Sequence, residues 1–107
     1  MTRKHLNASR KKVSMDGKTL AIAIKGRFDF SSHQDFRDAY EDVYPKPETF
    51  VVDLKETTYM DSSALGMLLL LRDHAGGDKA YIRVVNSSSD VRKILAISNF
   101  DKLFDIE

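Results

Sequence analysis

One short segment decides how this chain is understood: Asp61-Ser62-Ser63-Ala64-Leu65-Gly66. It follows an apolar stretch at residues 50–54 and opens a leucine-rich stretch that continues to Leu71. The apolar stretch is typical of a strand covered on both faces, and the leucine-rich stretch predicts a helix. Two serine hydroxyls therefore lie where a helix begins, at backbone N–H groups that have no partner within the helix. Serines in such a place can cap the helix, act as nucleophiles or accept a phosphate group.

Composition indicates one soluble domain. The chain has 107 residues, of which 42% are hydrophobic and 31% charged; this is the size and balance of a single globular domain. It contains no cysteine, which excludes disulfides and thiolate metal sites. The longest apolar run, residues 64–71, is far shorter than the roughly 18 to 20 residues that span a bilayer. No apolar segment of a signal peptide follows the basic N-terminus. We therefore expect a cytoplasmic protein with no membrane span.

The charge is unevenly distributed. Residues 1–12 contain five basic side chains and no acidic one. We expect residues 1–11 to form a flexible basic arm and residues 12–107 to form the folded domain. The arm has no aromatic residue among its basic ones, so it lacks the stacking groups of a single-strand binder, and we expect no direct contact with nucleic acid.

Hydrophobic periodicity and turn residues predict the element order ββαβαβαβ. Strands are expected at residues 12–15, 19–25, 50–54, 81–85 and 103–106. Helices are expected after a capping box of Ser32 and Asp35, from Asp61 to Gly76, and from residues 87–90 to Asn99. Asp16-Gly17 predicts a type I′ hairpin between the first two strands. The fold class is therefore α/β, with a mixed, mostly parallel sheet of four or five strands.

The sequence lacks the common catalytic arrangements. Gly17-Lys18-Thr19 is no phosphate-binding loop, because Lys12 stands where the first glycine belongs. No serine lies in a G-x-S-x-G elbow, and the three histidines lack metal-ligand spacing. We therefore expect no catalytic residue, no cofactor and no metal. Asp29 is either a plain polar residue of a strand-to-helix loop or a candidate for function, because it lies at a strand's carboxyl end, where ligands and partners of open α/β sheets bind. Asp53 lies inside an apolar segment, which favours a structural role.

Four segments together resemble the STAS domain family, which contains the anti-sigma factor antagonists and a domain of sulphate transporters. The central match is Val51–Leu54 followed by Tyr59–Gly66, with Ala64 in place of the family's commoner glycine. Gly26–Asp29 and Phe100–Ile106 are similar to two further family segments, and the resemblance covers about residues 12–106. It implies a single STAS-like domain with helices mainly on one side of the sheet. Family members usually continue into a final amphipathic helix, which this sequence does not contain.

The resemblance also implies a function. In the bacterial regulators of this family, a kinase phosphorylates the second serine of the pair, which is Ser63 here in preference to Ser62. The implied partner-binding residues are Asp29, Asp61, Ser62, Ser63 and Ala64. The implied partners are a GHKL-type serine kinase that is also an anti-sigma factor, and a PP2C-type phosphatase. The unphosphorylated protein would bind its partner and the phosphorylated protein would release it, acting as a monomer or weak dimer.

Other interpretations stay open. The two serines are also suitable as simple helix caps. Within the family, the chain could be a non-switching adaptor, as a subunit of a lipid-transport ABC complex or of a stress-signalling scaffold. Two weaker alternatives are a hydrolase with Ser63 as nucleophile and a nucleotide-binding domain. The identity of the partner does not follow from the sequence.

Overall fold

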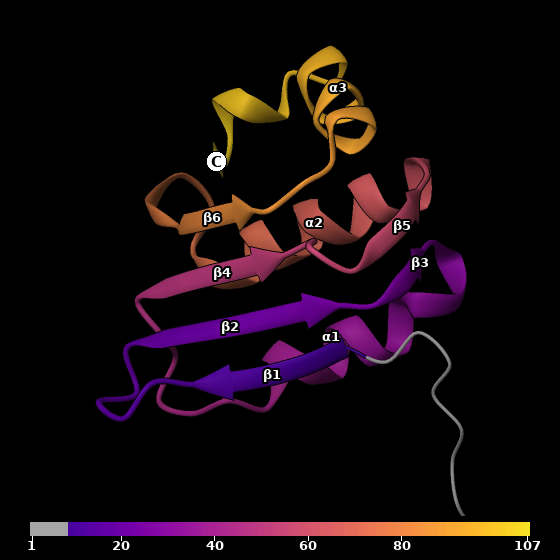
Figure 1. The fold of residues 1–107 in the computed structure, drawn as a ribbon. Coiled ribbons are helices and arrows are strands. Elements are labelled where there is room, and N and C mark those ends of the chain that lie inside the picture. Colours follow the sequence, from indigo (N-terminus) through magenta and orange to yellow (C-terminus); the bar gives the residue numbers. More distant parts are fainter. Residues whose placement is uncertain (1–8) are drawn as a thin grey trace, which may run out of the picture.

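A five-stranded mixed sheet organises the fold (Figure 1). In the computed structural model, which describes residues 9–107, the strand order is β1-β2-β4-β6-β7. The strands are β1 (Ser9–Val13), β2 (Thr19–Ile24), β4 (Thr49–Asp53), β6 (Tyr81–Val85) and β7 (Asp105–Ile106). Only β1 and β2 pair antiparallel; the other neighbours are parallel. The expected mixed, mostly parallel sheet is confirmed.

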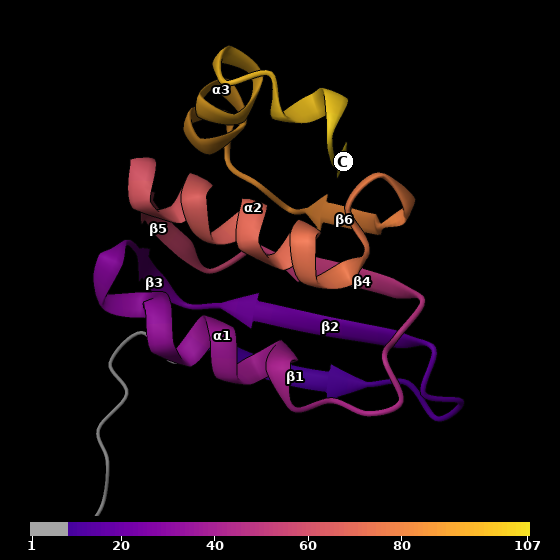
Figure 2. The ribbon, with the colours of Figure 1, turned by 180° about the vertical axis from the view of Figure 1, so that it is seen from behind.

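Helices cover one face of this sheet. Figure 2 shows α1 (His33–Glu41) and α2 (Ser62–Ala75) lying across the strands, with α3 (Ser89–Ile97) beyond β6. Three short 3₁₀ helices are η1 (Phe30–Ser32), η2 (Gly77–Lys79) and η3 (Phe100–Lys102). Alternate side chains of the central strands point into the core and are almost fully buried: Leu20, Ile22, Ile24, Phe50, Val52, Ile82 and Val84. Their partners on α2 are Ala64, Met67, Leu68 and Leu71. The expected single α/β domain is confirmed.

The opening hairpin differs from the prediction. β1 ends at Val13, three residues before Asp16, and Arg10 and Lys11 lie in the strand and not in an arm. The loop is wider than a type I′ turn, and only Gly17 of the predicted pair has a positive φ, +75°. The reason is side-chain bonding: the Ser14 hydroxyl donates to Asp16, and the Asp16 carboxylate accepts the N–H of Lys18 at 2.9 Å. The remainder of the arm predicted for residues 1–11, which is residues 1–8, lies outside the described residues.

A second, two-stranded sheet was not predicted. It pairs β3 (Gly26–Phe28) with β5 (Thr57–Met60) in parallel. The chain passes from β2 into β3 at Gly26, whose φ of +82° suits glycine alone, and the Gly26 N–H donates to the Glu56 carbonyl at 2.9 Å. The buried Thr57 hydroxyl donates to the Ile24 carbonyl at 2.8 Å. These bonds anchor the small sheet at the carboxyl end of β2.

Local signals placed both ends of α2 and the start of α3 correctly, whereas α3 ends at Ile97, before the expected Asn99. Asp61 caps α2, Ser88 caps α3 through the N–H of Val91, and α2 ends at Gly76 with a φ of +123°. Asp53 has the expected structural contacts, because its carboxylate accepts hydrogen bonds from the Lys55 N–H at 2.9 Å and from the Asn86 amide at 3.0 Å. It thus connects the carboxyl ends of β4 and β6.

Candidate functional site

The two strands of the small sheet bring Asp29 and Asp61 side by side. Phe28 pairs with Met60 in the parallel register, so the next residue of each strand is an aspartate at a carboxyl end. Each aspartate begins a helix. The Asp29 carboxylate accepts the Ser31 N–H at 3.0 Å, and the Asp61 carboxylate accepts the Ala64 N–H at 3.2 Å. Two residues 32 positions apart in the sequence thus form one edge of the molecule.

Both serine hydroxyls of the first turn make hydrogen bonds, one within the turn and one back to strand β3. The Ser31 hydroxyl donates to the Asp29 carboxylate. The Ser32 side chain is fully buried at 0% exposure, donates to the Arg27 carbonyl at 2.7 Å and accepts the Asp29 N–H at 3.3 Å. Ser32 is the N-cap residue of α1, as expected, but the predicted capping box with Asp35 is wrong, because the Ser32 hydroxyl bonds back to the strand. The reciprocal box is formed by Asp29 and Ser32.

The serine hydroxyls of the second turn make no hydrogen bond in the described part of the chain. Ser62 is exposed and Ser63 is half-buried. Within residues 9–107, neither hydroxyl makes a hydrogen bond, and the N–H groups of these two residues donate none. Both belong to the first turn of α2, where the helix dipole favours added negative charge. Ala64 differs from its neighbours in the predicted site, because it is 0% exposed and packs in the core.

Arg27 and Tyr59 complete the surface beside the two aspartates. They face each other across the small sheet, with the guanidinium 4.1 Å from the centre of the Tyr59 ring. The Arg27 Nε also donates to Asp29 Oδ2 at 2.9 Å. The hydrogen bond from Ser31, and next that from Arg27, lower the pKa of Asp29. The bond to Asp29 raises the pKa of Arg27, with a smaller contribution from the charge of Asp61.

Sequence analysis missed Arg27, Tyr59 and Phe30 as members of this surface. Phe30 follows Asp29 and is 77% exposed, which is unusual for a phenylalanine. A sequence signal for strand β5 was present, because residues 57–60 contain two threonines and a tyrosine, and β-branched and aromatic residues favour a strand.

The geometry offers no catalytic machinery at Ser63. No base contacts its hydroxyl within the described residues, so the nucleophile has no activating group there. In the same residues, no cluster of three or more potential ligands could hold a metal ion. Across residues 9–107, each helix is too short or too polar to cross a bilayer.

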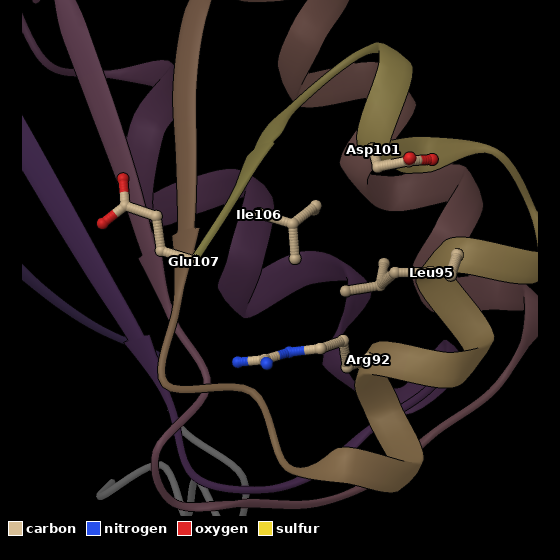
Figure 3. Close-up of a pocket in the computed structure, with 6 residues that line it drawn as sticks. Arg92, Leu95, Asp101, Ile106 and Glu107 are labelled. Carbon is tan, nitrogen blue, oxygen red and sulfur yellow. The ribbon is translucent and has the colours of Figure 1, made fainter.

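A separate hollow lies between α3 and the C-terminal strand (Figure 3). Its volume is about 420 Å³, and it is lined by Arg92, Leu95, Ala96, Asp101, Ile106 and Glu107. None of the predicted site residues lines it, so it is not part of the Asp29–Asp61 edge.

Comparison with known proteins supports the family resemblance that the sequence motifs indicated. The family model described as "Mlab, STAS domain" matches residues 12–105. A STAS-domain containing protein of Pseudomonas aeruginosa (strain UCBPP-PA14) is 67% identical over 93 residues, which cover 87% of this chain and 92% of that protein.

Solved structures share the fold. The phosphorylated form of the Bacillus cell fate determinant SpoIIAA has a TM-score of 0.71 at 18% identity, covering 94% of this chain and 91% of that chain. The STAS domain of the Vibrio cholerae SulP transporter has a TM-score of 0.64 at 18% identity, covering 78% of this chain and 68% of that chain. At these identities the likeness shows the fold alone. On the family match and the close relative, this chain belongs to the STAS domain family.

Proposed function

We propose that this protein is a phosphorylation-controlled binding switch of the anti-sigma factor antagonist type, acting in the cytoplasm. Ser63 is the modified residue, and Asp29, Asp61, Ser62 and Ser63 form the docking surface. A GHKL-type serine kinase that is also the anti-sigma factor, and a PP2C-type phosphatase, are its partners. The unphosphorylated protein binds its partner and the phosphorylated protein releases it.

One observation carries this proposal. Of the two aspartate-capped turns at this edge, only the second has hydroxyls that make no hydrogen bond within the described residues. A kinase can therefore modify Ser63 without breaking an internal hydrogen bond. The modification would cost the fold little, because the N–H groups and dipole of α2 favour an anion.

The same phosphate would change binding strongly. It adds about −1.5 to −2 charges at neutral pH, next to Asp29 and Asp61. A partner surface that closes over this edge would have to desolvate the added charge, at a cost of a few kcal/mol, and each 1.4 kcal/mol is about tenfold in affinity. The switch thus needs no large change of backbone shape.

Site mapping tests the modified residue. Purified protein is incubated with ATP and an extract of the source cells, and the phosphopeptides are identified by mass spectrometry. We expect phosphate on Ser63, and loss of labelling in Ser63→Ala but not in Ser62→Ala. Normal labelling of Ser63→Ala, with loss in Ser62→Ala, would contradict the assignment.

A pull-down tests the switch itself. Tagged wild type, Ser63→Ala and Ser63→Asp are compared for retention of a kinase partner, with Ser62→Ala as the matched control. We expect binding by wild type and both alanine variants and its loss in Ser63→Asp. Undiminished kinase binding by Ser63→Asp, confirmed with enzymatically phosphorylated protein, would rule the switch out.

A second candidate is a non-switching adaptor subunit, of a lipid-transport ABC complex or a stress-signalling scaffold. The match to the family model described as "Mlab, STAS domain" supports it. Copurification separates the two candidates: an ATPase subunit that stays bound to Ser63→Asp favours the adaptor, and a kinase that is released favours the switch.

A further inference from the structure

Arg27 lies at the Asp29–Asp61 edge, where it is bonded to Asp29. It lies on the outer face of the small sheet with Tyr59, and the residues two positions further along the two strands are Asp29 and Asp61. These four side chains form two neighbouring rows on one face, because alternate residues of a strand share a face. Ser63 lies in the helical turn that Asp61 caps. A phosphate on Ser63 would therefore stand within one turn of a carboxylate whose charge already acts on Arg27.

The bond between Arg27 and Asp29 can be exchanged without dismantling the first turn. Arg27 contacts Asp29 Oδ2, whereas both bonds from Ser31 go to Asp29 Oδ1. The cap on η1 consequently persists if the guanidinium moves. The Arg27 side chain is 56% exposed, and its guanidinium lies over the Tyr59 ring on this face.

We propose that Arg27 is the phosphate-receiving residue of the switch, exchanging its ion pair with Asp29 for one with the phosphate on Ser63. This inference rests on the proposed function and names the regulation of that site. A phosphoserine carries more charge than a carboxylate and offers three acceptor oxygens, which a planar guanidinium binds in a bidentate manner. The exchange leaves the Asp29 carboxylate without its cation, beside the exposed ring of Phe30.

This exchange makes the phosphate change two parts of the docking surface together. It adds charge at the start of α2 and uncovers charge on Asp29, one position before Phe30. A partner that contacts the β3–η1 side of the edge would therefore sense the phosphate without touching Ser63.

A phosphorus NMR titration tests the inference directly. Phosphoserine is incorporated at position 63 during synthesis, so no kinase is needed, and the second phosphate pKa is measured. All forms carry His33→Gln, which removes the imidazole that stacks on Phe30 beside this surface. The variants are Arg27→Gln and, as the matched control, Arg37→Gln, which removes an exposed arginine paired with Glu41 on α1.

We expect the second phosphate pKa in the parent and in Arg37→Gln to lie below that of Arg27→Gln by roughly 0.5. Equal values in the parent and Arg27→Gln would overturn the inference, as would an equal change in Arg37→Gln. Thermal melts of the unphosphorylated variants show that each is folded. Failure here leaves the proposed switch at Ser63 standing, whereas absence of phosphate on Ser63 in cells overturns the proposed function and not the measured contact.

Discussion

The two aspartate-capped turns of this protein share a pattern and differ in what their serines do. Asp29 precedes Ser31 and Ser32, and Asp61 precedes Ser62 and Ser63. In the first turn both hydroxyls are bound to the turn itself or to β3. In the second turn, within residues 9–107, they are bound to nothing. Similar residues at adjacent strand ends thus serve as structure in one place and remain available for chemistry in the other.

The difference comes from the length of the connection. In the first turn, one residue more separates the aspartate from the serine pair, so Ser32 reaches back to the strand and is buried there. In the second turn, α2 begins directly at Ser62 and Ala64 takes the buried position. The serines of the first turn therefore stabilise the fold, and we expect regulation at the serines of the second turn.

Removal of the buried hydroxyl should have the largest effect. Ser32→Ala leaves the Arg27 carbonyl without its buried donor, and we expect a loss of about 1–3 kcal/mol in the free energy of unfolding. For Ser63→Ala we expect a free energy of unfolding within about 0.5 kcal/mol of wild type, because loss of this hydroxyl removes no hydrogen bond within residues 9–107. Urea denaturation of both variants measures this, and equal losses would erase the distinction between the turns.

Removal of the caps should have a smaller effect. Asp61→Ala should lower the free energy of unfolding by about 1 kcal/mol, the usual value of an N-cap. Asp29→Ala should lower it further, because this carboxylate also bonds the Ser31 hydroxyl and Arg27. Asn variants at both positions retain an acceptor and serve as controls. A greater loss for Asp61→Ala would reverse the ranking.

Acid should weaken the first turn through Asp29. Hydrogen bonds from Ser31 and Arg27 lower the pKa of Asp29 below its ordinary value of 3.8. The contribution of this group to stability is therefore present above that pH and is lost as the pH falls through the lowered pKa. Thermal melts at decreasing pH should show a smaller loss between neutral and acid conditions for Asp29→Asn than for wild type. The same loss in both would contradict this account.

The exposed serines should give the smallest effect. Ser31→Ala removes a solvent-accessible bond to Asp29, and we expect a loss of a few tenths of a kcal/mol. Ser62→Ala should be close to neutral, because Ser62 is an exposed residue of the first turn of α2 and no bond is lost. Parallel urea titrations compare the two, and a larger loss for Ser62→Ala would show that its hydroxyl has a structural partner.

Sequence reasoning succeeded where the determining contacts are local. Asp61, Ser88 and Gly76 mark helix ends because each acts on backbone groups within about one turn. The prediction failed for strands whose hydrogen bonds join segments distant in the sequence. The strands β3 and β5 contain three and four residues and gain their hydrogen bonds from each other, across about 30 positions of sequence. The predicted type I′ turn was wrong for a local reason: Ser14 and Asp16 bond to each other, and the Asp-Gly pattern used for the prediction does not include that bond.

By itself the sequence determined the order of the main-sheet strands and the three α-helices, the caps of α2 and α3, and the resemblance that led to Ser63, since hydrophobic period, capping residues and a contiguous motif all depend on residues close together in the chain. Only the tertiary structure decided that Asp29 lies beside Asp61 and that Arg27 lies over Tyr59. It also decided that the Ser32 hydroxyl is hydrogen-bonded while the Ser63 hydroxyl, within residues 9–107, is not. Those facts depend on the register of two short parallel strands, which is set by contacts between segments distant in the chain.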